Sequence, residues 1–362
     1  MNLVQHLRAT GADVGLAGMG ICTVEPFETE YRAIQQRAAA GLHGGLRFTY
    51  ADPGKAADVR SSFPWAERLV VAAWAYVPGA GSPGASLPET GRVARFAEQD
   101  HYRGLRLSLG RLSRVLLEAG HRAEPIADDS RLLDRAAAVR AGVGWWGRST
   151  MVLAPRHGPW LLLGSVVTDA DLAVDEPMRR DCGTCDACLS ACPTGALADG
   201  VLDARLCLAR LLQAPGVIPI GLRKAVGDRV YGCDDCLEVC PPGLRALGSD
   251  HRVSGRVDLV AMLQMSDRGL LETHDHWYIP RRNARYLRRN ILVALGNTGG
   301  ERAVSVAAGY LGHPDWLLRA HAAWTLGRLG GPAAAAALGE ASAFERHPEV
   351  CMEIATAAGS LA

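Results

Sequence analysis

The 362-residue chain lacks several features that would assign it at once to a broad class. Its formal net charge is only +1, so no global electrostatic signal for nucleic acid exists. The longest apolar run, Leu69 to Val77, is about half a membrane span. The first thirty residues carry His6, Arg8, Asp13 and Glu25 where a signal peptide needs an unbroken apolar stretch. We therefore expect a cytoplasmic protein that does not associate with membranes.

Lysine is nearly absent as well. Only Lys55 and Lys224 stand among the 39 basic residues, and the other 37 are arginine. The planar guanidinium suits phosphate and base stacking, although high-GC codon usage explains the same bias without any function. A composition of 48% hydrophobic and 21% charged residues excludes disorder and collagen-like repeats, and the length predicts two or three domains.

Cysteine, in contrast, is abundant, and eight of the ten cysteines are concentrated in residues 182–240. In a reducing compartment such a concentration indicates metal or redox chemistry rather than disulfides. The run Cys182-x2-Cys185-x2-Cys188-x3-Cys192-Pro is typical of bacterial ferredoxins, in which three thiolates bind one 4Fe-4S cluster and the fourth binds another. Paired Cys-x2-Cys spacing also occurs in zinc sites, which need neither the triple run nor the x3-Cys-Pro ending.

A second run, Cys233-x2-Cys236-x3-Cys240-Pro, lacks its first cysteine, and Cys207 is the only unassigned cysteine in the stretch. The ferredoxin crossover predicts two clusters with no ligand left over. The first set is Cys182, Cys185, Cys188 and Cys240, and the second is Cys192, Cys207, Cys233 and Cys236. The remaining two, Cys22 and Cys351, are most simply buried thiols.

The chain divides into three predicted domains. Residues 1–175 have an α/β pattern, with strands at 68–76 and 160–168 and helices at 102–119 and 131–140, the second one capped by Asp129 or Ser130. Residues 176–245 form the cysteine-rich, ferredoxin-like domain. Residues 246–362 are a connection followed by helical repeats, because 288–296 recurs as 319–327 and again, degenerately, at 350–358. That offset of 31 residues is typical of HEAT-like helical pairs.

Together these stretches resemble the epoxyqueuosine reductase family. The resemblance covers nearly the whole chain, and it depends on residues 41–45, Arg60, 94–97, 100–102, 128–147, the Cys182 run, 231–236 and the C-terminal repeat. It implies a nitroreductase-like N-terminal α/β domain that binds cobalamin, as in reductive dehalogenases. The two-cluster domain and an all-α, HEAT-like, tRNA-binding tail would follow.

The family activity implied is the reduction of epoxyqueuosine to queuosine in tRNA, the last step of queuosine biosynthesis. An external low-potential donor would supply electrons, which pass through the two 4Fe-4S clusters to cobalamin, and we expect a monomer. Two alternative functions would use some of the same cofactors. One is a cobalamin and iron-sulfur reductase of a small molecule, similar to reductive dehalogenases, and the other is a ferredoxin-like electron carrier with no catalysis of its own.

The resemblance also assigns roles to single residues. Asp128 matches the family's proton donor, which protonates the departing oxygen; as an alternative, Asp128 and Asp129 merely cap the next helix. Contacts to cobalamin are implied for five residues, although strand packing explains Val152 and Leu163 equally well. These five are Arg60, Ser149, Val152, Leu163 and Asp234.

Arginines are the candidate tRNA ligands. Arg135 matches a substrate-side contact, or is an exposed helical arginine paired with Asp134 or Glu124. Residues 280–289 carry five arginines and a tyrosine, which suits phosphate contacts and base stacking, or a solvated helix face. The five are Arg281, Arg282, Arg285, Arg288 and Arg289. The chain departs from the family pattern, and so leaves the substrate open, at His101-Tyr102, Arg148-Ser149, Leu212 and Leu237.

Overall fold

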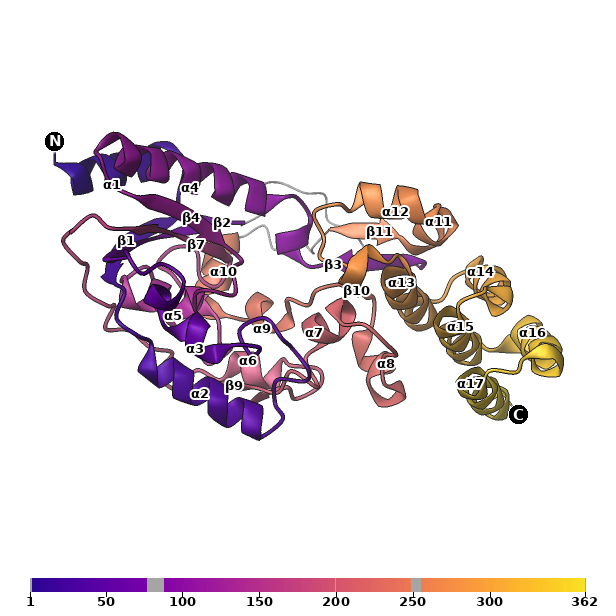
Figure 1. The fold of residues 1–362 in the computed structure, drawn as a ribbon. Coiled ribbons are helices and arrows are strands. Elements are labelled where there is room, and N and C mark those ends of the chain that lie inside the picture. Colours follow the sequence, from indigo (N-terminus) through magenta and orange to yellow (C-terminus); the bar gives the residue numbers. More distant parts are fainter. Residues whose placement is uncertain (1, 77–87, 199, 249–254, 362) are drawn as a thin grey trace. The chain divides into compact units, whose positions relative to one another are not determined.

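The computed structural model describes residues 2–76, 88–198, 200–248 and 255–361. They form two compact units, each assembled from separate stretches of sequence (Figure 1). Unit 1 comprises Met1–Gly79, Gln99–Arg205 and Asp235–His251, and unit 2 comprises Ala80–Glu98, Leu206–Asp234 and Arg252–Ala362. This division differs from the three consecutive domains predicted at 1–175, 176–245 and 246–362, because the cysteine-rich stretch contributes to both units.

A four-stranded antiparallel sheet forms the centre of unit 1, in the order β1-β2-β7-β4. Its strands are β1 (Gly18–Thr23), β2 (Arg68–Ala75), β7 (Leu161–Thr168) and β4 (Ala123–Ala127). The two predicted strands are confirmed as β2 and β7. Both are buried along most of their length, because α4 (His101–Glu118) covers one face of the sheet and α5 (Asp134–Arg140) the other (Figure 1).

Helix α4 approaches the sheet closely at Gly164. A Cβ at this position would lie 2.7 Å from Cδ1 of Leu109 and 3.1 Å from the carbonyl oxygen of Ile126, so a larger residue would displace the Leu109 side chain. The other elements of unit 1 are two longer helices, α1 (Leu3–Asp13) and α2 (Glu28–Ala39), and several short helices and strands. The short elements are α3 (Pro53–Ala57), η1 (Val59–Ser61), β5 (Trp145–Trp146), β6 (Val152–Leu153), α6 (Ala187–Ser190), β8 (Leu197–Ala198), β9 (Val201–Leu202), α9 (Asp235–Glu238) and α10 (Pro241–Leu247).

The helix expected at 131–140 begins only at Asp134, and the expected cap is wrong. The N-cap position is Leu133, which makes no side-chain capping bond. Asp129 instead accepts hydrogen bonds from the backbone N–H of Arg131 at 2.9 Å and from its guanidinium at 2.6 Å. The aspartate therefore closes a local turn before the helix.

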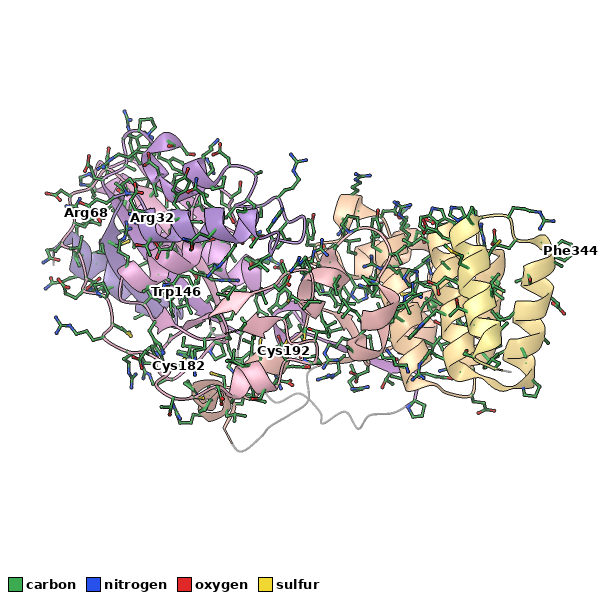
Figure 2. All side chains as sticks on the ribbon, turned by 90° about the horizontal axis from the view of Figure 1, so that it is seen from below. Arg32, Arg68, Trp146, Cys182, Cys192 and Phe344 are labelled. Carbon is green, nitrogen blue, oxygen red and sulfur yellow. The ribbon has the colours of Figure 1, made fainter. Side chains whose placement is uncertain are left out.

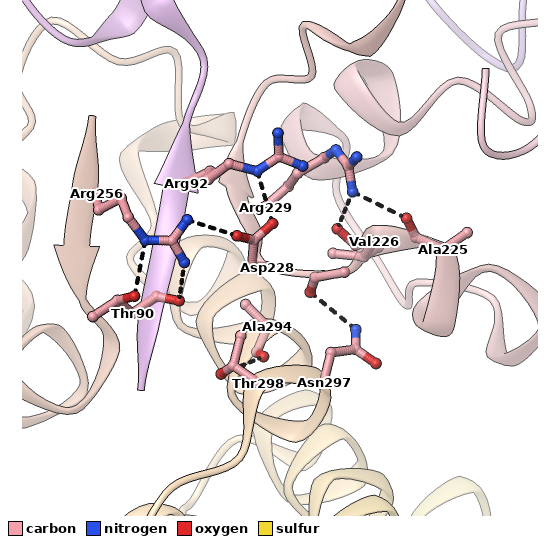
Figure 3. A network of polar contacts seen from close by, with 11 residues as sticks. Thr90, Arg92, Ala225, Val226, Asp228, Arg229, Arg256, Ala294, Asn297 and Thr298 are labelled. Atoms are coloured by element: carbon pink, nitrogen blue, oxygen red, sulfur yellow. Dashed lines mark hydrogen bonds and ion pairs between the residues drawn. The ribbon is translucent and has the colours of Figure 1, made fainter. Parts of the chain in front are cut away.

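Unit 2 contains a small sheet whose short strands have no clear pattern in the sequence. Its order is β10 (Arg229–Tyr231), β3 (Thr90–Val93) and β11 (Arg256–Asp258). Asp228 accepts bonds from Arg92 at 2.8 Å and Arg256 at 2.9 Å, so one carboxylate ties the three strands together (Figure 3). These bonds outweigh the effect of burial and lower the pKa of Asp228.

The helical repeats complete unit 2. α13 (Arg285–Thr298), α15 (Trp316–Leu329) and α17 (Pro348–Gly359) pack in series and confirm the offset of 31 residues. The repeated glycine lies where the helices approach: a Cβ on Gly296 would meet Trp324 at 2.9 Å, and one on Gly327 would meet Ala357 at 2.7 Å. The other elements are η2 (Arg95–Ala97), α7 (Leu208–Gln213), α8 (Ile220–Val226), α11 (Leu259–Gln264), α12 (Asp267–Thr273), η3 (Pro280–Arg282), α14 (Ala303–Gly309), η4 (Tyr310–Gly312) and α16 (Gly331–Phe344).

Within the described ranges, no helix is both long enough and apolar enough to span a bilayer.

Candidate functional site

The first predicted cysteine set lies together in unit 1. Cys188 is in α6, Cys182 and Cys185 precede it, and Cys240 is the N-cap residue of α10. Burial raises the pKa of Cys240, and the charges of Cys182, Cys188 and Cys185 raise it further, against a backbone hydrogen bond from Gly243. The four thiols are therefore close enough to repel one another as thiolates, a cost that iron offsets when it binds.

Two contacts bring this set together. The fully buried indole of Trp160 donates a hydrogen bond to the carbonyl of Gly243 at 3.1 Å, which anchors α10 and with it Cys240. The guanidinium of Arg148, on the turn between β5 and β6, donates to the carbonyl of Cys185 at 3.2 Å. Arg148 is one of the departures from the family pattern, and in this chain it holds the loop that carries three of the thiols.

The second predicted set is divided between the units: Cys192 and Cys236 belong to unit 1, and Cys207 and Cys233 to unit 2. The Sγ atom of Cys192 accepts a bond from the backbone N–H of Ala196 at 3.2 Å (Figure 2 labels Cys182 and Cys192). Burial raises the pKa of this thiol, but hydrogen bonds from Thr194, Ala196 and Leu197 outweigh the effect of burial and lower the pKa. Such N–H donors suit a cluster-bound thiolate.

In unit 2, Cys233 has apolar neighbours, whereas Cys207 lies near the charged side chain of Arg210. Cys207 is the N-cap residue of α7, and Cys233 packs against the cluster that includes Leu212 of this helix. Leu212, which stands where the family has a polar residue, is thus a core residue here. In the parts of the chain that the structure describes, no three His, Cys, Asp or Glu side chains converge on one metal ion. A 4Fe-4S cluster needs a wider arrangement, because each iron takes its own thiolate.

A group of acids lies after β4 in unit 1. Asp128 is exposed and has a φ of 54°, a left-handed conformation that few residues other than glycine adopt. Partial burial of its carboxyl raises the pKa of Asp128; the charge of Arg106 opposes this, and that of Asp129 adds to it. An aspartate with a raised pKa on an exposed loop can donate a proton.

Asp134 lies next to Asp128 in this group, in the first turn of α5. Its Oδ1 atom is buried without a hydrogen-bond partner among the described residues. Burial raises the pKa of Asp134 well above the usual value, and the charge of Asp128 raises it further. Tyr102 of α4 belongs to the same group, because burial and then the charges of both aspartates raise the pKa of its phenol.

Two arginines border the acids. The guanidinium of Arg106 lies 5.4 Å from the centre of the Tyr102 ring. Arg135, predicted as a tRNA contact, is exposed and donates to the carbonyl of Thr150 at 3.3 Å. The sequence alone assigns no role to Asp134, Tyr102 or Arg106, and its only signal is an acid directly after the apolar pair 132–133.

The predicted cobalamin contacts have different surroundings. In unit 1, Arg60 is exposed and donates to the carbonyl of Ala66 at 3.0 Å and to Glu67 at 3.1 Å. The other three in unit 1 are in or beside strands: Ser149 is 7% and Val152 3% exposed, and Leu163 of β7 is partly exposed.

In unit 2, the buried carboxylate of Asp234 accepts a bond from the backbone N–H of Arg95 at 2.7 Å. Arg60 and Leu163 thus remain accessible to a large ligand, whereas Val152 belongs to the core of unit 1.

The prediction of phosphate contacts is wrong for Arg288 and Arg289, which are 6% and 1% exposed. Arg288 donates to the carbonyls of Leu263 at 2.8 Å and Met265 at 2.6 Å, and to Asp267 at 2.8 Å. Arg289 donates to the carbonyls of residues 211 and 214 at 3.2 and 2.9 Å. Both guanidiniums are already bonded inside unit 2, so neither forms a solvated basic face nor reaches a phosphate.

The first part of the same run is exposed. Arg281 and Arg282 have φ angles of 55° and 49° in the turn η3, and Tyr278, three residues before, is 66% exposed. Arg282 donates to the carbonyls of residues 275 and 271 at 3.1 and 2.9 Å. Arg285 is partly exposed and lies 3.4 Å from Asp315. The turn therefore presents guanidiniums and a phenol ring to solvent.

Comparisons with known proteins agree with this description. A family model for a 4Fe-4S double cluster binding domain matches residues 181–243, and one for HEAT repeats matches residues 279–359. Epoxyqueuosine reductase of Vibrio cholerae is 32% identical over 338 residues, which cover 90% of this chain and 91% of that protein.

Solved structures agree over the whole chain. A crystal structure of epoxyqueuosine reductase with an epoxyqueuosine-modified tRNA-Tyr stem loop has a TM-score of 0.91 and 28% identity, and covers 99% of this chain and 100% of that one. The Bacillus subtilis epoxyqueuosine reductase, solved with its catalytic aspartate loop swung out of the active site, has a TM-score of 0.90 and 28% identity, and covers 100% of both chains. The chain belongs to the epoxyqueuosine reductase family.

Proposed function

We propose that this protein is the oxidoreductase that reduces epoxyqueuosine to queuosine in tRNA, in the cytoplasm. The observation that carries the proposal is the combination, within unit 1, of a four-thiol cluster site and an exposed aspartate with a raised pKa. The family membership supplies the substrate, because a relative of this fold is solved with the modified stem loop. Electrons and protons are the two reactants that such a reduction consumes.

The electron side consists of two 4Fe-4S clusters and cobalamin. We assign one cluster to Cys182, Cys185, Cys188 and Cys240, and the other to Cys192, Cys207, Cys233 and Cys236. Cobalamin, when bound, supplies a strongly reducing cobalt centre. Arg60 and Leu163 suit it because they remain accessible, and Ser149, Val152 and Asp234 would border it through strand and turn positions. An external low-potential donor feeds this path, and the protein acts as a monomer with a nitroreductase-like first domain.

Asp128 is the proposed proton donor to the departing oxygen. Its loop directly follows β4 and is exposed, which is the setting expected for a catalytic loop that moves, as in the Bacillus subtilis structure. Asp134 does not suit this role, because it is in the first turn of a helix and its Oδ1 atom is buried.

The tRNA surface has fewer arginines than the sequence suggested. We propose Arg135 beside the acids, and Arg281, Arg282 and Arg285 on the turn η3 and the start of α13. Tyr278 offers a ring for base stacking near this turn. Arg288 and Arg289 are not part of this surface.

Anaerobic reconstitution with iron, sulfide and cobalamin, followed by nucleoside analysis of epoxyqueuosine-containing tRNA, tests the function. The expected result is queuosine, with about eight iron and eight sulfide per chain. Conversion of a halogenated small molecule without conversion of tRNA would favour the dehalogenase-like reading, and cluster reduction without any turnover would favour the electron carrier.

The ligand assignment has a matched control. Cys240→Ser should remove about half of the iron, because one of two clusters loses a ligand. Cys22→Ser should leave the iron content unchanged, since this thiol is buried at the carbonyl of Ala137, 3.8 Å away. Equal iron in both variants would show that the assignment of Cys240 is wrong.

A further inference from the structure

The reaction requires more protons than one aspartate holds. Converting an epoxide to an alkene breaks two carbon–oxygen bonds, forms one carbon–carbon double bond and releases water, so it consumes two electrons and two protons. The clusters provide the path for the electrons. Asp128 carries a single proton, and after donating it this residue is a carboxylate. A second proton must therefore come from another group.

Asp134 is a second carboxylic acid beside Asp128. It belongs with Asp128 and Tyr102 to one cluster built from α5, the loop after β4 and α4, and its Oδ1 has no partner among the described residues. A carboxyl with an oxygen buried without a hydrogen-bond partner favours its neutral form, because the charged form would lose hydration there. The cluster thus contains a second carboxylic acid that the assigned mechanism does not use.

We propose that Asp134 is a positioning residue for Asp128 and holds the second proton of the reaction. Asp128 first protonates the epoxide oxygen as one carbon–oxygen bond breaks. Asp134 then returns a proton to the Asp128 carboxylate, directly or through one water molecule, and Asp128 delivers it to the hydroxyl group that leaves as water. Solvent reprotonates the pair through the exposed Asp128. This inference rests on the proposed function.

The charges around the pair set the order in which the two acids ionise. Burial raises the pKa of Asp134 well above its usual value, the charges of Asp128 and Asp129 add to this, and Arg135 opposes it. The pKa of Asp128 is raised less, because the positive charge of Arg106 opposes the effect of partial burial. Asp134 therefore keeps its proton at a pH where Asp128 has already lost its own. Tyr102 does not compete as an acid, because its pKa is raised above that of a free phenol.

Infrared difference spectroscopy on the full-length protein tests the proton without any turnover. At a pH at which Asp128 is already ionised, the wild type should still show the carbonyl stretch of a protonated carboxyl, and Asp134→Asn should lack it. In Asp128→Asn the same band should disappear at lower pH, because the charge that raises the pKa of Asp134 is gone. A band that persists in Asp134→Asn, or that titrates identically in Asp128→Asn, would overturn the proposal. The comparison of the wild type with Asp128→Asn leaves Asp134 intact, so it tests the proposal even if Asp134→Asn folds poorly.

Single-turnover kinetics of the reconstituted enzyme tests the transfer. Asp134→Asn should slow product formation by about 10²-fold, the lower end for a positioned proton donor, whereas Asp134→Glu should restore most of the rate. Asp129→Asn is the matched control: it removes a neighbouring carboxylate that is bonded to Arg131, and should react at nearly the wild-type rate at low pH. If Asp128→Asn is inactive but Asp134→Asn reacts normally, this inference fails and the proposed function stands. If Asp128→Asn reacts normally, the acid assigned in the proposed function is wrong.

Discussion

The acid group of unit 1 and the repeat helices of unit 2 differ in how their carboxyl groups are hydrogen-bonded. Asp134 of unit 1 has a buried carboxyl oxygen without a partner, and its pKa is raised. Glu345 of unit 2 accepts bonds from Arg319 at 2.6 and 3.1 Å and from two backbone N–H groups, and these bonds lower its pKa to about 2. The first carboxyl is prepared to hold a proton, and the second is fixed as an anion.

The arginines of unit 2 show what the bonded arrangement does. Arg288 and Arg319 occupy equivalent positions in two repeats, 31 residues apart, and each donates to backbone carbonyls at a helix end or loop: Arg288 to residues 263 and 265, Arg319 to residues 313 and 314. A guanidinium with all its donors engaged stabilises helix packing and has little left for a ligand. A buried polar atom without a hydrogen-bond partner therefore identifies the candidate active site better than a high density of charged residues does.

The largest expected effect concerns Asp128. Asp128→Asn should fold and bind its cofactors but turn over about 10²–10⁴-fold more slowly, because a general acid is lost. The wild-type rate should be full at low pH and fall as the pH rises through the raised pKa of Asp128, since only the protonated form donates. Asp129→Asn should move this fall to lower pH, because the charge of Asp129 helps to raise that pKa. Rates measured across a range of pH check both points. A near-normal rate in Asp128→Asn would show that Asp128 is not the general acid.

The next effect is on stability and belongs to the bonded region. Arg288→Gln should lower the free energy of unfolding by about 3 kcal/mol or more, because bonds from one cation to Asp267 and two carbonyls contribute roughly 1.5–3 kcal/mol each. Urea unfolding of the reconstituted protein measures it, with Arg281→Gln as the exposed control. A loss of tRNA affinity at unchanged stability would contradict the structural role given to Arg288.

Sequence reasoning reached the elements that periodicity and spacing encode. The strands β2 and β7, the helix α4 and the repeat were all predictable, because apolar patterns and a recurring Leu-Gly pair record packing directly. The grouping of the first four thiols followed from the ferredoxin spacing.

What could not be predicted depends on tertiary contacts. The run 280–289 reads as uniformly basic, yet α13 turns Arg288 and Arg289 into the core while η3 leaves Arg281 outside. Likewise, Asp134 differs from any other first-turn acid because the fold buries its Oδ1 atom without a hydrogen-bond partner among the described residues. Local sequence carries no record of either event.

The smallest expected effect concerns Arg281, and it tests whether the exposed part of the arginine run contacts phosphate. Each phosphate contact contributes roughly 0.7–0.9 to the slope of log affinity against log salt concentration. Arg281→Gln should therefore flatten the slope for tRNA binding by about this amount, with cluster content and unfolding free energy unchanged, because the side chain is exposed in the turn η3. Binding titrations at several salt concentrations measure the slope. An unchanged slope would show that Arg281 only extends into solvent. Other arginines would then bind the phosphates, and Arg135 would be the next to test.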